Sequence, residues 1–110
     1  MNESFNKEQF SSDIVKDWAG DKLLKVEVRV EIRYIFDDKH LCVRLTLPSD
    51  HDLRRAHFWN LTIFDDPGKL EVHIRNTLDH LYFEIQAGAV AKSIMNAREN
   101  PGKDLHFDNL

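Results

Sequence analysis

The residues of this chain that could carry out catalysis are a single cysteine and a few histidines and carboxylates. Cys42 would be a nucleophile only if a nearby cation lowered its pKa, and Arg33 is the nearest candidate in the predicted hairpin. His73, His80 and Asp79 are the residues that could serve as a general acid or base. Cys42 and His40 are two residues apart at one end of the predicted hairpin, which alone is weak support for a catalytic pair. Because no catalytic motif accompanies them, the sequence favours a protein that is not an enzyme.

Two pairs of adjacent aspartates are the residues most suited to a cation site, because Mg²⁺ and Ca²⁺ prefer oxygen ligands. These pairs, Asp37-Asp38 and Asp65-Asp66, lack the spacing of a calcium-binding loop, and aspartate near proline or glycine is typical of turns. The histidines lack the spacings of zinc sites, and the glycines form no phosphate-binding loop. The sequence therefore predicts no metal site and no cofactor.

Length and composition indicate the class of protein. The chain has 110 residues, of which 42% are hydrophobic and 31% are charged, which is typical of one globular domain spanning 1–110. One cysteine cannot form an intramolecular disulfide, no apolar run could span a bilayer, and the first residues do not resemble a secretion signal. The net charge of −4 gives no overall attraction to nucleic acids or anionic membranes. We therefore expect a cytoplasmic protein that does not bind membranes.

The first element expected is a helix over 7–19. Asn6 is suited to cap its N-terminus, with Gln9 as the other half of a capping box, and Gly20 is suited to end it. Apolar residues recur about every four positions and form one stripe, which is typical of an amphipathic helix. The stripe consists of Phe10, Ile14, Val15 and Trp18.

A hairpin is expected next, because the apolar period changes from four to two. Residues 24–36 and 41–47 alternate apolar and polar side chains, which predicts two antiparallel strands with one buried face. Residues 37–40 are expected to form a four-residue turn between them. The facing pairs predicted by this turn are Phe36 with Leu41, Tyr34 with Val43, and Ile32 with Leu45.

A second hairpin is expected after a short helical turn that runs from Ser49 to about Ala56. Alternating apolar residues indicate strands over 59–64 and 69–75, joined by the turn 65–68. Under a four-residue turn, the apolar residues of both strands again lie on one side of the sheet. The inward residues of this hairpin are Trp59, Leu61, Ile63, Leu70, Val72 and Ile74.

A long C-terminal helix is expected from about Asn76 or Thr77 to Arg98. It carries two apolar stripes, so a helix buried on two sides, one of them at a dimer contact, would explain the pattern. A fifth strand over 81–86 followed by a helix is the alternative, since short apolar runs do not distinguish the two. The tail 103–110 is expected to be loosely docked or disordered. The stripes are Leu78, Leu81, Tyr82, Ile85 and Ala89, and Phe83, Ala87, Val90, Ile94 and Ala97.

The predicted fold is α+β, with a four-stranded (alternatively five-stranded) antiparallel sheet of two hairpins in the order α-β-β-β-β-α. The N-terminal helix and the long C-terminal helix pack on one face, so the other face is expected to be exposed. Its outward positions hold six cations and three carboxylates, so this face is basic although the chain is acidic. The residues expected to bind a partner are Arg29, Arg33, Arg44, Phe58, Phe64, His73 and Arg75.

We interpret the chain as a non-enzymatic protein-interaction module, such as a small acidic adaptor, inhibitor or immunity-type protein. It would bind a protein partner, or a second copy of itself, through the open sheet face or the C-terminal helix. One alternative is a single-stranded nucleic-acid-binding protein in which Phe58 and Phe64 stack on bases. Another is a small enzyme with a His/Asp acid–base site in a pocket between the sheet and the helices. A solvated face stabilised by cross-strand ion pairs, with no partner, also fits the alternating charges.

Overall fold

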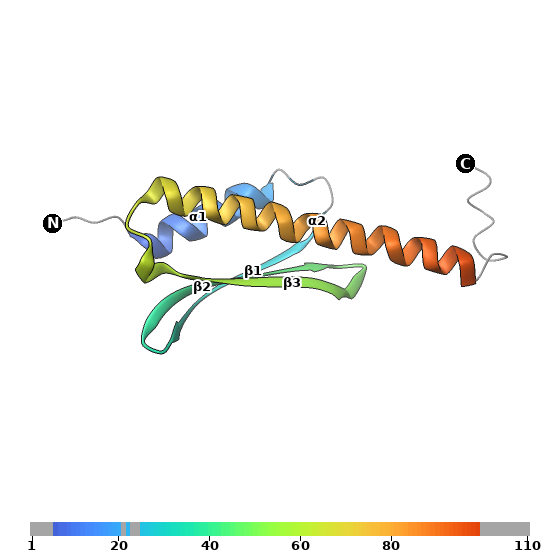
Figure 1. Ribbon diagram of the computed structural model, residues 1–110, viewed down its shortest axis with the longest axis horizontal. Helices are drawn as coiled ribbons and strands as arrows, with labels where there is room; N and C mark the ends of the chain where they lie inside the picture. The colour runs from blue at the N-terminus through green and yellow to red at the C-terminus, as the bar shows by residue number, and fades with distance from the viewer. Residues whose placement is uncertain (1–5, 21, 23–24, 100–110) are drawn as a thin grey trace.

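The chain folds into a three-stranded sheet with two helices, as the computed structural model shows for residues 6–20, 22 and 25–99 (Figure 1). The predicted tail 103–110 lies outside the described residues. The order is α-β-β-β-α, so the predicted α+β class with an antiparallel sheet is confirmed, but four or five strands were wrong. The elements are α1 (Lys7–Gly20), β1 (Glu27–Ile35), β2 (Asp38–Leu47), β3 (Asp50–Asn60), the 3₁₀ turn η1 (Leu61–Ile63) and α2 (Pro67–Glu99).

The predicted N-terminal helix is present as α1, with the expected cap. The Asn6 side-chain oxygen accepts a hydrogen bond from the Gln9 backbone N–H at 3.1 Å. Ile14, Val15 and Trp18 are buried, so the stripe that the sequence predicted faces the core. The spacing of apolar residues and the cap therefore agree in this segment, which is why its bounds were predictable.

The β1–β2 hairpin turns two residues earlier than the sequence suggested. Phe36 and Asp37 occupy the turn with φ of 49° and 68°, the left-handed conformation that a two-residue hairpin turn requires. Ile32 therefore lies opposite Leu41 rather than opposite Leu45. Phe36 was predicted to point into the core, and instead it is 97% exposed at the tip. The predicted four-residue turn was therefore wrong, and the predicted strand register was off by four residues. Because side chains alternate between faces, an even error leaves each strand residue on the predicted face.

A third strand replaces the predicted helical turn between Ser49 and Ala56. β3 pairs antiparallel with β2 in the order β1-β2-β3, after a tight turn at Pro48-Ser49. Leu53 and Trp59 are buried beneath the helices, and they are six residues apart, which matches the two-residue period of a strand. The short helix was therefore wrong, because pairing with the edge of β2 satisfies the backbone of this segment.

The predicted fourth strand over 69–75 is the beginning of α2, and the fifth strand over 81–86 lies inside this same helix. Asp66 caps the helix, since its side chain accepts a hydrogen bond from the Gly68 N–H at 2.8 Å, and Pro67 is its first residue. Val72, which a strand would have buried, is 58% exposed. The buried residues of α2 recur every three or four positions: Leu70, Ile74, Leu78, Leu81 and Ile85.

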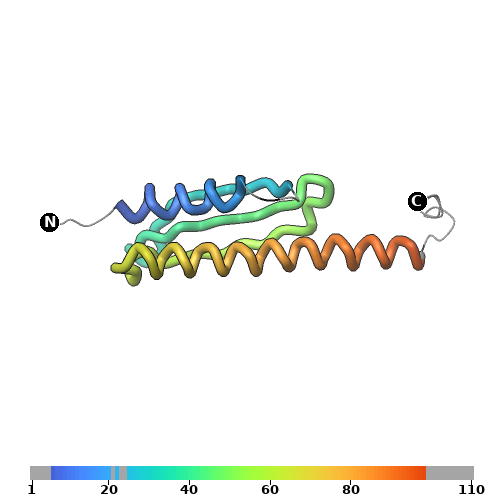
Figure 2. The backbone as a smooth tube through the Cα atoms, turned by 90° about the horizontal axis from the view of Figure 1, so that it is seen from above, coloured from blue at the N-terminus to red at the C-terminus, as the bar shows by residue number. Residues whose placement is uncertain are grey.

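Both helices cover one face of the sheet, so the molecule has two layers (Figures 1 and 2). α1 lies over β1 and β2, and α2 lies beside α1 and over β3. The Trp18 indole N–H donates to the Asp79 carboxylate at 2.8 Å and joins the two helices. Neither described helix is long and apolar enough to cross a membrane. The buried centre between the layers is formed by Val15, Leu41, Val43, Leu45, Trp59, Leu61, Leu70, Ile74, Leu78 and Ile85.

α2 runs past the end of the sheet (Figure 1). It crosses the β2–β3 turn at Gly88, where a Cβ atom would lie 2.8 Å from Leu53 Cδ2, so the small residue allows close approach. One turn later, the Lys92 ammonium donates to the Asp50 carboxylate at 2.8 Å. These contacts hold the middle of α2 on the sheet and leave its last turns projecting beyond it.

Candidate functional site: the open face of the sheet

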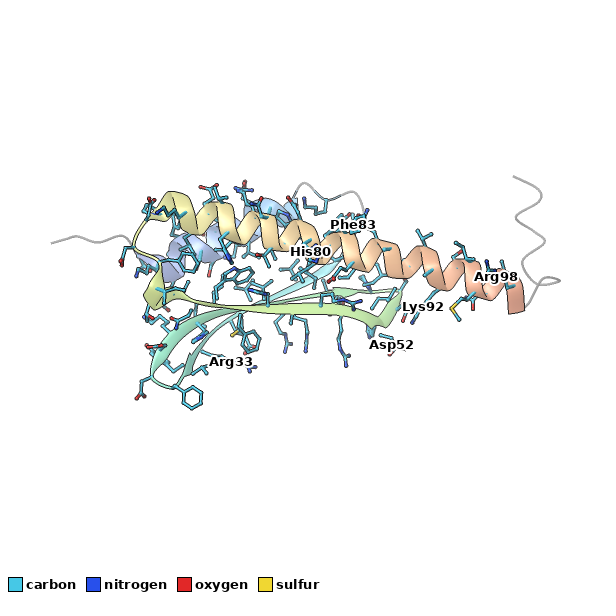
Figure 3. The ribbon with its side chains drawn as sticks, in the orientation of Figure 1. Arg33, Asp52, His80, Phe83, Lys92 and Arg98 are labelled. Atoms are coloured by element: carbon cyan, nitrogen blue, oxygen red, sulfur yellow. The ribbon has the colours of Figure 1, made fainter. Side chains whose placement is uncertain are left out.

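The face of the sheet that points away from the helices carries alternate residues of all three strands. Because side chains alternate along a strand, the residues between the core positions all lie on this face. Figure 3 shows the Arg33 side chain on the side of the sheet opposite to both helices. We call this surface the open face, and it consists of Glu27, Arg29, Glu31, Arg33, Cys42, Arg44, Thr46, Arg54, Ala56 and Phe58.

The charges of the open face are not arranged as cross-strand ion pairs. Arg29 lies directly opposite Arg44 in the β1–β2 register, and like charges in that position repel. Among the described residues, neither arginine lies within ion-pair distance of a carboxylate. Arg33 does have a partner, since its guanidinium lies 3.1 Å from the Glu31 carboxylate on the same strand. The open face therefore carries two arginines whose charges are available to an anionic group.

A shallow cleft of about 170 Å³ lies between these arginines. Cys42 is buried in its floor, and burial raises the pKa of the thiol, with Glu31 acting in the same direction and Arg33 opposing it. A raised pKa keeps the thiol neutral, so the site does not favour a cysteine nucleophile. The cleft is smaller than the pockets that take drug-sized ligands. It is lined by Arg29, Glu31, Arg33, Cys42, Val43, Arg44, Ala56 and Phe58.

Four of the seven residues predicted to bind a partner lie together on the open face, and three do not. The four are grouped around the cleft: Arg29, Arg33, Arg44 and Phe58. Phe64 and His73 lie near each other instead, on the side of the sheet that carries the helices, with ring centres 5.5 Å apart. Arg75 forms ion pairs of 2.8 Å with Asp17 on α1 and of 2.9 Å with Glu71 on α2.

The misplacement of these three residues follows from the misassigned segment. Their outward orientation depended on the second hairpin, in which 69–75 was a strand. Conversely, Arg54 and Ala56 belong to the open face but were missed, because 49–56 was predicted to be a helical turn. Arg54 lies opposite Thr46, and Ala56 lies opposite Arg44. The one signal for this strand was the in-phase spacing of Leu53 and Trp59, which is weak because histidine and arginine occupy the positions between them.

A second hollow, of about 770 Å³, runs along the outer side of α2 next to β3. His57, His73 and His80 line it, and the Trp59 indole N–H donates to Nδ1 of His73 at 2.9 Å. Burial, and then the neighbouring His73, lower the pKa of His57, so this ring favours the neutral form. Among the described residues, no group of three or more His, Cys, Asp or Glu side chains could hold a metal ion.

The hollow brings together two of the three residues that were predicted as a general acid or base. His73 and His80 both line it, whereas Asp79 hydrogen-bonds Trp18 on the side of α2 that faces α1. The space between the sheet and the helices, where that site was expected, is filled by the core. Of the three predicted acid–base residues, the hollow therefore includes His73 and His80 but not Asp79, and His57 and Asp66 also line it.

Comparison with protein families, with characterised proteins and with solved structures finds no match for the chain. The open face is therefore the candidate site because of its geometry alone. Its distinguishing feature is a set of arginines around one cleft on a protein whose net charge is −4.

Proposed function

We propose that the chain is a non-enzymatic, cytoplasmic protein-interaction module that binds an acidic segment of a partner protein through the open face. An adaptor, an inhibitor or an immunity-type protein would work in this way, since each acts by covering a surface. The proposal depends on one observation above all: Arg29 on β1 lies directly opposite Arg44 on β2, and neither has a carboxylate partner in the part of the chain that the structure describes.

This arrangement favours binding over mere solubility. A face selected only for solubility would place glutamate opposite arginine, because opposite charges in cross-strand positions stabilise a sheet and like charges destabilise it. On the open face, Glu31 lies opposite Cys42 and Glu27 lies opposite Thr46, so neither is placed opposite an arginine. A carboxylate from a partner, seated between Arg29 and Arg44, would remove the repulsion and gain charge-assisted hydrogen bonds.

The size and lining of the cleft support a side chain as the bound group. A volume of about 170 Å³ is suited to one acidic side chain rather than to a cofactor. Phe58 is exposed at the rim and could pack against an apolar neighbour of that carboxylate. Aromatic and arginine side chains together are typical of the residues that contribute most to protein interfaces.

Nucleic-acid binding by the same face has less support. The stacking platform was expected to combine Phe58 and Phe64 on the open face. Phe58 lines the cleft of the open face, whereas the Phe64 ring packs against His73 on α2, although both residues also border one hollow at the edge of β3. Glu27 and Glu31 on the open face, together with the net charge of −4, oppose a phosphate backbone. The binding experiment therefore includes a single-stranded oligonucleotide beside the acidic peptide.

The test compares charge reversal on the open face with charge reversal elsewhere. Arg29→Glu/Arg44→Glu is the test variant, and Lys16→Glu/Lys69→Glu, on exposed helix positions, is the control with the same net charge. Fluorescence anisotropy with a glutamate-rich peptide and with a single-stranded oligonucleotide, at low and moderate salt, would measure binding. We expect the peptide to bind the wild type and the control but not the test variant.

Two results would contradict the proposal. Equal loss of peptide binding in both variants would mean that binding depends on the net charge of the protein and not on the open face. Stronger binding of the oligonucleotide than of the peptide, with a steep dependence on salt, would favour the nucleic-acid hypothesis instead. Affinity capture from the native host with wild type and Arg29→Glu/Arg44→Glu in parallel would then identify the natural partner.

A further inference from the structure

α2 carries a second apolar stripe on the side that faces away from the sheet. Phe83, Val90 and Ile94 are 65%, 60% and 50% exposed, although each is a large apolar side chain. Successive helix residues are about 100° apart, so Phe83 lies about 200° around the axis from the buried Leu81. Figure 3 shows the Phe83 side chain pointing away from the sheet. We call this set the outer stripe: Phe83, Ala87, Val90, Ile94 and Ala97.

The spacing of the outer stripe is that of a coiled-coil seam. Its members are separated by four, three, four and three residues, which is the repeat that keeps a seam facing a second helix. The two alanines, Ala87 and Ala97, leave space between the larger side chains, so a facing helix could interdigitate with the stripe. Exposed apolar residues scattered singly would need no explanation, but a continuous stripe at this spacing does.

We propose that a second copy of the chain covers the outer stripe, with the two α2 helices packed antiparallel. A second copy offers a matching seam, because each helix presents the same small and large residues. We align the two antiparallel helices so that Phe83 of one copy packs against Ile94 of the other. In this register Ala87 packs against Val90 of the other copy. The pair is symmetric, so one surface serves both copies.

The charges beside the outer stripe favour the antiparallel arrangement. Asp79 and Glu84 flank the stripe five residues apart, and in a parallel pair they would face each other across the seam and repel. In the antiparallel register above, Arg98 at the end of each helix lies on the same side of the seam as Glu84 of the other copy, about 7.5 Å away along the axis. The acidic beginning and basic end of the stripe therefore complement each other only when the helices run in opposite directions.

The length of α2 supplies the area that a dimer needs. From Asp79 to Arg98 the helix is about 30 Å long, and pairing along it would bury on the order of 600 Å² per copy. The resulting total of about 1,200 Å² reaches the lower end of the range for stable, specific interfaces. Residues 93–96 and Arg98 are exposed on the part that projects beyond the sheet. A helix end without tertiary contacts is marginal in water, so a partner helix would stabilise it.

The dimer leaves the open face free, because the outer stripe and the open face lie on opposite sides of the molecule. The inference goes beyond the proposed function and does not depend on it. Arg29→Glu/Arg44→Glu should leave the oligomeric state unchanged, so failure of one proposal does not decide the other.

Sedimentation of the full chain tests the dimer, with two neighbouring substitutions as test and control. Ile94→Glu places a carboxylate in the seam and should raise the dimer dissociation constant at least about a hundredfold. Met95→Glu is the control, since Met95 is 55% exposed on the same helix but about 100° away from the stripe. We expect wild type and Met95→Glu to sediment as dimers and Ile94→Glu to sediment as a monomer. A wild type that remains a monomer at high micromolar concentration, or equal effects of both substitutions, would overturn the proposal.

Disulfide trapping tests the direction of the helices. In a Cys42→Ala background, Phe83→Cys and Ile94→Cys chains are prepared separately and then mixed under mild oxidation. The antiparallel dimer predicts a disulfide between the two different chains in the mixture and little in either chain alone. A disulfide that forms in Phe83→Cys alone would overturn the antiparallel arrangement, because equivalent residues this far from the two-fold axis, about 16 Å apart along an antiparallel pair, meet only in a parallel pair.

Discussion

Replacing Arg44 by glutamate is expected to make the protein more stable and, at the same time, less able to bind an acidic partner. The substitution converts the Arg29–Arg44 pair on the open face from two like charges to two opposite charges. Both residues are exposed, so no packing changes and the effect is electrostatic. Most single substitutions destabilise a protein, which makes a gain in stability an unusual and informative result.

The neighbours of position 44 set the size of the gain. Arg29 is directly opposite, whereas Glu27 and Glu31 are diagonal neighbours on β1 and Arg54 is a diagonal neighbour on β3. Directly opposed Cβ atoms lie about 5 Å apart and diagonal ones about 7–8 Å, so Arg29 is the strongest single neighbour. Repulsion from Glu27 and Glu31 offsets most of the gain from Arg29, and attraction to Arg54 leaves a small net stabilisation. Allowing for these opposing terms and for solvent screening on an exposed face, the change is worth about 0.2–0.5 kcal/mol. In a domain of this size that corresponds to an increase of about 1–3 °C in melting temperature.

Thermal and urea denaturation at low and at high salt would measure this gain. Arg44→Thr serves as the comparison, because it removes the repulsion without adding an attraction and should fall between wild type and Arg44→Glu. The gain should shrink at high salt, since exposed charges are screened. A variant that is less stable than wild type at low salt, or a gain that salt does not reduce, would refute the electrostatic account of the Arg29–Arg44 pair.

Three further predictions concern the helices and the β2–β3 turn. Leu70→Ala should lower the free energy of unfolding by about 2–5 kcal/mol in urea denaturation, and Val72→Ala by less than about 0.5 kcal/mol, because α2 buries the first side chain and exposes the second. Equal losses would indicate that residues 69–75 form a strand rather than a helix. Asp66→Ala should cost about 1 kcal/mol by the same assay, through loss of the α2 cap. The hydrogen bond from Lys92 lowers the pKa of Asp50, so its contribution is present above the usual aspartate pKa and is lost as the pH falls through the lowered value. Lys92→Met should therefore be less stable than wild type at neutral pH and equally stable in acid.

The elements that could be predicted from the sequence are those in which several local signals agree. The Asn6 cap and the apolar stripe both indicate the same N-terminal helix, and no other period competes with them. β1 and β2 alternate over enough residues to be distinguished from a helix. The β1–β2 turn was predicted wrongly because Phe36, an apolar residue in phase with the strand, adopts a left-handed conformation that glycine or asparagine usually supplies.

The segment 59–74 was misread because two periods coincide in it. Leu70, Val72 and Ile74 alternate as in a strand, yet Leu70 and Ile74 are also four residues apart, as on one face of a helix. The deciding signal was local: Asp66-Pro67 is a helix cap followed by the proline that favours a first helical position. Reading it as a hairpin turn gave the chain a fourth strand, and with it the outward positions assigned to His73 and Arg75.

The candidate site was less sensitive to these errors than the fold, and the reason is geometric. A side chain's face on a strand depends only on whether its position is odd or even, so a register error of four residues left Arg29, Arg33 and Arg44 where they were predicted. What register does decide is which charges meet. The predicted turn would have placed Arg33 opposite Arg44, whereas the two-residue turn at Phe36 places Arg29 there instead and leaves Glu31 beside Arg33. The basic face thus follows from the sequence pattern, while the unpaired arginines that could bind a carboxylate follow from the turn.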